Sequence, residues 1–210
     1  MHEQPALSRV GAACGAVFAI VLFVANGDGS NSFSGPRAVA AITALTLALP
    51  FIAYLCSILR GAEGANGWLS STALVTGVAG ITLKLASGVP ELAMHRARVA
   101  DGTPLHRVLD ELGGGATVLC LYPLAVFAAA TAVLVLRTGV LPRWLGIGAA
   151  ITAAALAVNA CFLDTSVMPG LLVFILWTIV TSIVLVRRTR VEVATARPAS
   201  AASAAARTLG

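Results

Sequence analysis

Charged residues are scarce in this chain. Only 11% of its 210 residues are Asp, Glu, Lys or Arg, whereas a typical soluble domain has about 25%. Hydrophobic residues make up 58%, a balance that excludes an ordinary water-soluble protein. The net charge is +5, but the basic residues form no stripe with interleaved aromatics, so we expect no nucleic-acid partner. The lipid bilayer is the partner that this composition predicts.

Residues that usually carry chemistry are missing from the apolar segments. These segments contain no histidine, which argues against a haem held by two imidazoles, and no Asp or Glu lies well inside them. Walker, HExxH, GxSxG and Rossmann patterns are also absent. We therefore predict no cofactor, apart from the zinc considered below. The cysteines form no CxxC pair, and we expect small buried thiols at Cys14, Cys56, Cys120 and Cys161.

Six long windows without interior charge divide the chain, apart from one lysine in the third. Each approaches the roughly 20 residues that cross a hydrocarbon core. Barrel strands would alternate in polarity over about ten residues, whereas these windows are apolar on all sides. The sequence therefore predicts an all-α fold, a polytopic bundle of six transmembrane helices in one domain over residues 1–186. The expected spans are 10–27, 38–59, 64–89, 116–136, 144–163 and 168–186.

The distribution of basic residues predicts the orientation of the bundle. With the N-terminus inside, nine arginines lie in cytoplasmic segments and four in outer loops. Cytoplasmic loops carry the excess of Lys and Arg, so we expect both termini inside. The segment 187–210 begins RRTR and becomes rich in Ala and Ser, which is typical of a disordered cytoplasmic tail.

The outer segment between the third and fourth spans is long enough to hold structure of its own. Thr103 followed by Pro104 is a helix start, and three consecutive glycines, Gly113 to Gly115, are expected to stop the helix. The residues between them predict a short amphipathic helix that lies on the bundle or in the headgroup region. Its apolar stripe consists of Leu105, Val108, Leu109 and Leu112.

Two pairs of residues four apart in this outer segment suggest a metal. On helices, Glu91 with His95 and His106 with Asp110 would each share one face, and their four ligand atoms suit zinc. The spacing matches no recognised ligand signature. The alternative is that these residues form the solvated face of a loop helix.

Lys84 is the one formal charge inside a predicted span. Such a residue suggests a functional site, because burying a charge is costly. A specific role predicts a partner at Asn159 or Asp164, near the outer end of the fifth span. Because Lys84 lies close to the outer end of its helix, its ammonium could instead extend to the headgroups without a fixed protein contact.

Small residues mark the surfaces where helices can approach closely. Gly11 and Gly15 form a GxxxG in the first span, and two other pairs lie in the third and fifth spans. We expect helix packing within the chain. The alternative is a homo- or hetero-oligomer formed through Gly11 and Gly15.

The stretch RTGVLPRWLGIGAAITAAALAVNACF and the last span ending LWTIVTSIVLVRR resemble a broad group of uncharacterised bacterial multi-span membrane proteins, many from actinobacteria. In that group Arg-Trp-Leu-Gly opens the penultimate helix, and a last helix containing Trp ends in Arg-Arg. The resemblance covers about the last 55 residues. It implies a bacterial plasma (inner) membrane, with Arg143 and Trp144 at the inner interface, and it implies no activity.

Two function hypotheses follow. The first is a non-enzymatic bundle, either carrier-like or an accessory or sensing subunit, with an outward-facing polar pocket for a small molecule or lipid near Lys84, Asn159 and Asp164. The alternative is a membrane-embedded enzyme with a metal in the outer segment. The missing catalytic motifs favour the first hypothesis.

Overall fold

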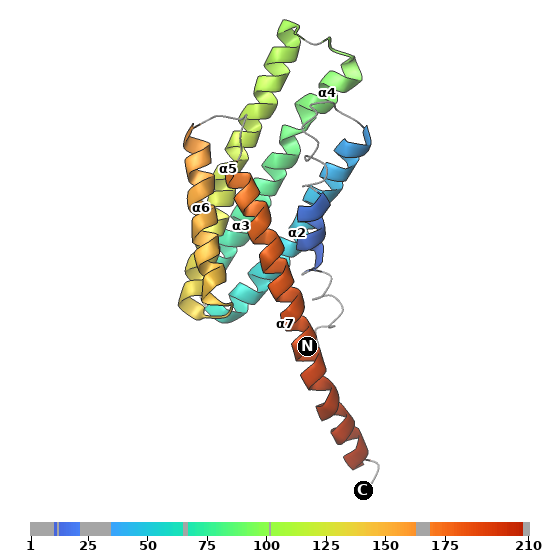
Figure 1. Cartoon of the computed structure of the whole chain (residues 1–210), viewed down its shortest axis with the longest axis vertical. Helices are drawn as coiled ribbons and strands as arrows, with labels where there is room; N and C mark the ends of the chain where they lie inside the picture. Colours follow the sequence, from blue (N-terminus) through green and yellow to red (C-terminus); the bar gives the residue numbers. More distant parts are fainter. Residues whose placement is uncertain are drawn as a thin grey trace.

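The computed structural model describes residues 11, 13–21, 35–64, 67–100, 102–162 and 169–207, and every regular element among them is a helix (Figure 1). The predicted all-α fold is thereby confirmed. Residues 13–21 are helical and precede the six labelled helices. These are α2 (Gly35–Glu63), α3 (Trp68–Ser87), α4 (Val89–Ala97), α5 (Pro104–Thr138), α6 (Arg143–Phe162) and α7 (Pro169–Arg207).

Five stretches of the described residues are long and apolar enough to cross a membrane. Large apolar side chains also cover the outside of the bundle, such as Val75, Ile151 and Leu176, each more than half exposed. Soluble monomers rarely show so much contiguous apolar surface, whereas lipid-facing helices require it. The architecture is that of a multi-pass membrane protein. The five stretches are Val39–Glu63, Trp68–Ala97, Pro104–Thr138, Arg143–Phe162 and Pro169–Arg188.

The first predicted span, 10–27, lies partly outside the described residues. Its described part, 13–21, is helical but too short to cross a bilayer alone. The sixth span and the two-sided topology therefore stay predictions.

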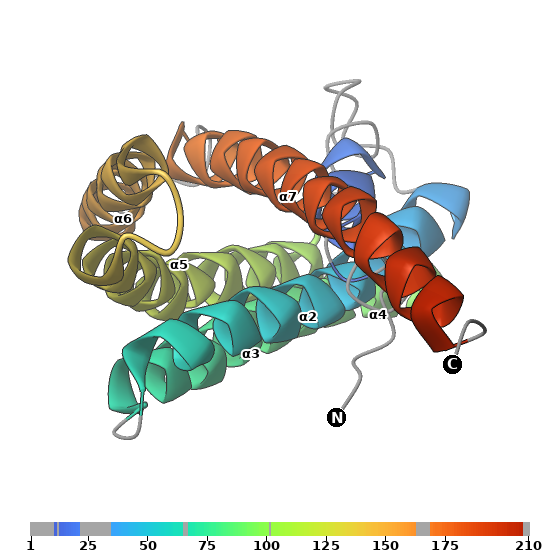
Figure 2. The ribbon, with the colours of Figure 1, turned by 90° about the horizontal axis from the view of Figure 1, so that it is seen from below.

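Helix α5 is the centre of the bundle. It packs most extensively against α3 on one side and α6 on the other, and it also contacts α2 and α4. Helix α7 packs on α6 and crosses the bundle obliquely (Figures 1 and 2). Because successive helices alternate in direction, one end of the bundle carries Lys84 and the other carries Arg143. We refer to these as the Lys84 end and the Arg143 end.

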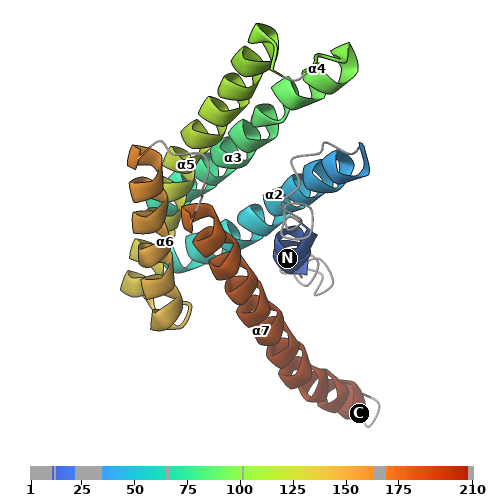
Figure 3. The ribbon, with the colours of Figure 1, turned by 45° about the horizontal axis from the view of Figure 1, so that its top comes forward.

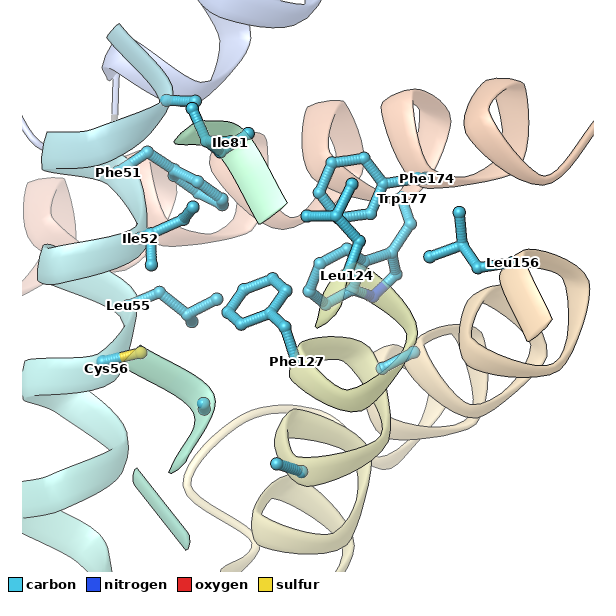
Figure 4. Close-up of a cluster of buried hydrophobic side chains, with 14 of the residues drawn as sticks. Phe51, Ile52, Leu55, Cys56, Ile81, Leu124, Phe127, Leu156, Phe174 and Trp177 are labelled. Atoms are coloured by element: carbon cyan, nitrogen blue, oxygen red, sulfur yellow. The ribbon is translucent and has the colours of Figure 1, made fainter. Parts of the chain in front are cut away.

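Aromatic side chains fill the core where α5 and α7 face each other (Figure 4). The ring centroid of Phe127 lies 6.4 Å from that of Phe174 and 6.1 Å from that of Trp177, and both pairs meet edge to face. Phe51 and Leu156 close the cluster from α2 and α6. Edge-to-face contacts are favourable because the positive edge of one ring meets the negative face of the other. The rings also fill the space between the helices.

Helix α5 differs from the short helix that was predicted for the outer segment. It begins as expected, because Thr103 Oγ1 accepts a hydrogen bond from the His106 backbone N–H at 3.2 Å. It does not stop at the glycines but continues from Pro104 to Thr138, with Pro123 inside it. The first turns of α5 therefore join α4 in a helical hairpin that extends beyond the ends of α2 and α6 (Figure 3).

Tertiary packing explains why the glycines do not end the helix. A Cβ on Gly113 would lie 3.3 Å from the Ser87 carbonyl oxygen, so α5 approaches the α3–α4 junction closely at this position. Helix packing here outweighs the low intrinsic helix propensity of glycine. Of the predicted stripe, Leu105, Val108 and Leu112 are exposed rather than packed on the bundle. Contact of these side chains with the headgroup region stays a prediction.

The end of α7 also differs from the sequence prediction. A disordered tail was expected over 187–210, whereas α7 continues to Arg207. The segment is rich in alanine, the residue with the highest helix propensity. The membrane-spanning part ends at Arg188.

Gly11 and Gly15 face their own chain. A Cβ on Gly11 would lie 2.8 Å from Tyr54 Cβ, and one on Gly15 would lie 2.2 Å from Ser182 Oγ and 2.4 Å from Phe51 Cδ2. The first helix therefore packs against α2 and α7 through this pair. The helix face that carries Gly11 and Gly15, considered above as a possible contact with a second chain, is therefore in contact with α2 and α7 of the same chain.

Candidate functional site

Lys84 lies in the last turn of α3 and is directed toward α5. Its Nζ donates a hydrogen bond to Thr117 Oγ1 over 3.2 Å. Thr117 is only 7% exposed, so the ammonium is held at the α3–α5 interface although Lys84 itself is half-buried. An ammonium that simply extends to the headgroups would have no such fixed contact.

Small polar groups surround this contact. Ser87 Oγ donates to the Lys84 carbonyl at 2.7 Å, and Cys120 Sγ donates to the Thr117 carbonyl at 3.0 Å. Glu91, in the first turn of α4, adds a carboxylate near Lys84. The ammonium has three N–H donors, and the hydrogen bond to Thr117 uses one of them. The site therefore combines a membrane-embedded cation with donor capacity for a ligand.

Glycines bring α3 and α5 close enough for this contact. A Cβ on Gly80 would lie 2.6 Å from Leu124 Cγ, and one on Gly77 would lie 3.0 Å from Phe127 Cδ2. Their predicted role in close helix packing is confirmed. Two turns of α3 therefore lie directly on α5, and the next turn presents Lys84 to Thr117.

Asn159 connects α6 to the start of α7. It is 8% exposed, and its Oδ1 accepts a hydrogen bond from the Gly170 backbone N–H over 3.1 Å. It thus satisfies a backbone donor in the first turn of α7, as a capping group does. This described hydrogen bond joins Asn159 to α7 and not to Lys84. The other expected partner, Asp164, lies outside the described residues.

The four residues proposed for zinc lie on the projecting hairpin. Glu91 and His95 are exposed on α4, while His106 is half-buried and Asp110 is exposed on α5. Both histidines have interactions with other groups. Across the described residues, no three side chains of His, Cys, Asp or Glu gather closely enough to hold a metal ion.

A carboxylate contact at the Arg143 end was not predicted. Glu63, the last residue of α2, accepts hydrogen bonds from the backbone N–H groups of Leu69, at 3.0 Å, and Ser70, at 2.9 Å. It supplies the N-cap that α3 lacks, since Gly67 has no side chain. Negative charge at a helix N-terminus is favourable. No local capping pattern reveals it, because the donors lie six and seven residues away.

Buried hydroxyl groups without partners occur deeper in the bundle. In the described part of the chain, three buried side-chain oxygens have no hydrogen-bond partner, and they belong to Thr131, Thr181 and Ser182. Most Ser and Thr hydroxyls here instead bond to a carbonyl three or four residues earlier, as Thr178 does to Phe174 over 2.8 Å. Unsatisfied buried groups in a native fold call for an explanation.

Comparison with known proteins supplies no assignment. No protein-family model, curated protein or solved structure matches this chain.

Proposed function

We propose that this protein is a non-enzymatic membrane bundle, carrier-like or an accessory or sensing subunit, that binds a small anionic ligand at Lys84. The observation that supports the proposal is the hydrogen bond between Lys84 Nζ and Thr117 Oγ1 at the α3–α5 interface. A charge in a spanning segment is costly unless it has a function or a compensating partner. A hydroxyl compensates an ammonium only partly, so a ligand carboxylate would complete the site.

The chemistry of the site favours one negative charge on the ligand. The ammonium has donors to spare, and the Thr117 hydroxyl can both donate and accept. Glu91 adds a negative charge nearby, which disfavours strongly anionic ligands by repulsion. A monocarboxylate, either a small molecule or a lipid-derived acid, matches this balance.

The proposed setting is a bacterial plasma membrane with six spans and both termini inside. Nine arginines against four support the orientation. Under this topology the Lys84 end faces outward. The hairpin of α4 and α5 then projects from the outer surface beside the ligand site.

The experiment is a thermal-shift measurement on detergent-purified protein with acetate, glutamate, succinate and decanoate. We expect a monocarboxylate to raise the melting temperature of the wild type, and Lys84→Met to abolish that rise. Arg96→Met is the control, because Arg96 is exposed on α4. A panel without any stabilising acid, or an equal rise in Lys84→Met, would refute the proposed site.

The alternative function is an enzyme that uses zinc on the outer hairpin. The packing of α4 against α5 supports it, because it places the helices that carry Glu91 with His95 and His106 with Asp110 side by side. Metal analysis of the purified protein separates the two functions. Stoichiometric zinc that is lost in His106→Ala would favour the enzyme over the ligand-binding bundle.

A further inference from the structure

A pocket of about 540 Å³ lies at the Arg143 end, where the α5–α6 loop meets α7. It is far along the chain from Lys84 and belongs to the opposite end of the bundle. Its lining consists of Gly139, Val140, Leu141, Pro142, Arg143, Val184 and Arg188. Two of these seven residues are arginines, and none of these described lining residues is acidic.

The loop that forms one wall is well fixed. Gly139 caps α5 with φ of +64°, which a glycine adopts without strain, and its N–H donates to the Val135 carbonyl at 3.0 Å. Leu141 is 3% exposed and anchors the loop in the core. The Leu145 N–H donates to the Pro142 carbonyl at 2.9 Å. The pocket is therefore formed before any ligand binds.

The two arginines of the lining come from different helices, Arg143 from α6 and Arg188 from α7. Arg188, on α7, donates a hydrogen bond from Nη1 to the Val140 carbonyl, which holds its guanidinium against the loop. A guanidinium keeps its positive charge when it donates such a hydrogen bond. Arg143 opens α6, whose first turn contains no acidic residue. The positive end of the α6 dipole therefore adds to the two arginine charges.

The position along the helices identifies the source of the anion. The spanning stretch of α5 ends at Thr138, that of α6 begins at Arg143, and that of α7 ends at Arg188. The pocket consequently lies where apolar surface gives way to polar surface, at the level of lipid headgroups. Trp144 beside it is 53% exposed, as interfacial tryptophans are. Val184 and Leu141 supply apolar lining below the charges.

We propose that this pocket binds the phosphate of an anionic phospholipid headgroup. Arginine matches phosphate oxygens with paired N–H donors, and basic pockets between membrane helices suit such headgroups. The lipid acyl chains would extend along the exposed apolar surface of α6 and α7. The site is independent of the ligand proposed at Lys84, because no residue is shared.

The test is native mass spectrometry of the full-length, delipidated protein titrated with phosphatidylglycerol. Arg143→Gln is the decisive variant, because Arg143 is exposed and its replacement leaves the packing intact. We expect binding to weaken about tenfold, the loss typical of one hydrogen bond to a charged group. Arg188→Gln should weaken it similarly, while Arg188→Lys should retain part of the affinity. Equal affinity for phosphatidylglycerol in wild type and Arg143→Gln would overturn the proposal.

Controls distinguish the pocket from general charge and from free phosphate. Arg137 is exposed at the same end but does not line the pocket, so Arg137→Gln should bind as the wild type does. Phosphatidylcholine with the same acyl chains should bind more weakly, because its headgroup has no net charge. If inorganic phosphate in millimolar excess displaces phosphatidylglycerol completely, the site takes free phosphate and the lipid assignment is wrong.

Discussion

Trp177 donates a hydrogen bond from its indole Nε1 to the backbone carbonyl of Leu145 over 3.2 Å. Leu145 belongs to the Arg-Trp-Leu-Gly sequence that opens α6, and Trp177 is the tryptophan of the last helix. Gly148 lies under the indole, since a Cβ there would be 3.3 Å from Trp177 Cδ1. The two stretches that carry the expected resemblance, at the start of α6 and within α7, are therefore in contact. The hydrogen bond from Trp177 to Leu145 fixes α7 on α6.

We predict that Trp177→Phe lowers the free energy of unfolding by about 1–3 kcal/mol, because it removes a buried hydrogen bond and part of the ring volume. Thermal denaturation of the purified protein measures the change. Trp144→Phe is the matched control, since Trp144 is 53% exposed and should tolerate the change. Equal melting temperatures for the two variants would contradict the prediction.

Gly115 tests whether α5 is continuous. No atom lies within 4 Å of a Cβ added there, so within a helix Gly115→Ala should raise stability by up to about 1 kcal/mol. If the glycines ended the helix, the same change would strain the cap and lower stability. Gly80→Ala is the contrasting variant and should be clearly destabilising, because its Cβ would meet Leu124 Cγ at 2.6 Å. Melting temperatures of the three proteins decide between continuity and termination.

Thr181 and Thr178 form a matched pair on α7. The Thr181 hydroxyl is buried without a partner, so Thr181→Val should leave stability unchanged or raise it by about 1 kcal/mol. Thr178→Val removes the hydrogen bond to Phe174 and should lower it by about 1 kcal/mol. A marked loss of stability in Thr181→Val would reveal an ordered water or ligand bound to that hydroxyl.

The topology prediction is tested by reporter fusions. A reporter after Gly210, or one between Arg137 and Arg143, should be cytoplasmic, while one near Asp101 should be outside. Asp101 itself lies outside the described residues. A cytoplasmic signal at Asp101 would mean that the number of spans before it is wrong.

Much of the bundle follows from hydropathy. The sequence predicts a fifth span over 144–163, and α6 covers Arg143–Phe162. The start of α6 was predictable because Pro142 is the last loop residue and Arg143 marks the expected membrane interface. The helix that contains the fourth span begins earlier than that span, at Pro104. Local propensity marks the glycines at 113–115 as a helix end, and it cannot register the Ser87 carbonyl against which Gly113 packs.

The candidate site was predictable only in part. Lys84 is conspicuous as the single charge within a span, whereas its partner Thr117 lies 33 residues away and resembles any other span residue. The pairing depends on how α3 and α5 are rotated toward each other, which side-chain volume and the glycines of α3 determine. For the same reason the sequence offered Asn159 as one possible partner of Lys84, whereas its described hydrogen bond is with Gly170. A sequence shows which polar residues lie near the same end of a bundle, but not which of them form hydrogen bonds with each other.

The length of α5 has a mechanical consequence. Its 35 residues span about 50 Å at 1.5 Å per residue, well beyond a hydrocarbon core of about 30 Å. One helix therefore links the projecting hairpin, the aromatic core at Phe127 and the loop that forms the arginine-lined pocket. Pro123 interrupts its hydrogen-bond ladder midway, and a helix bends most readily at such a point. A sideways force on the hairpin would therefore bend α5 near Pro123 and shift its other end, which leads into the arginine-lined pocket.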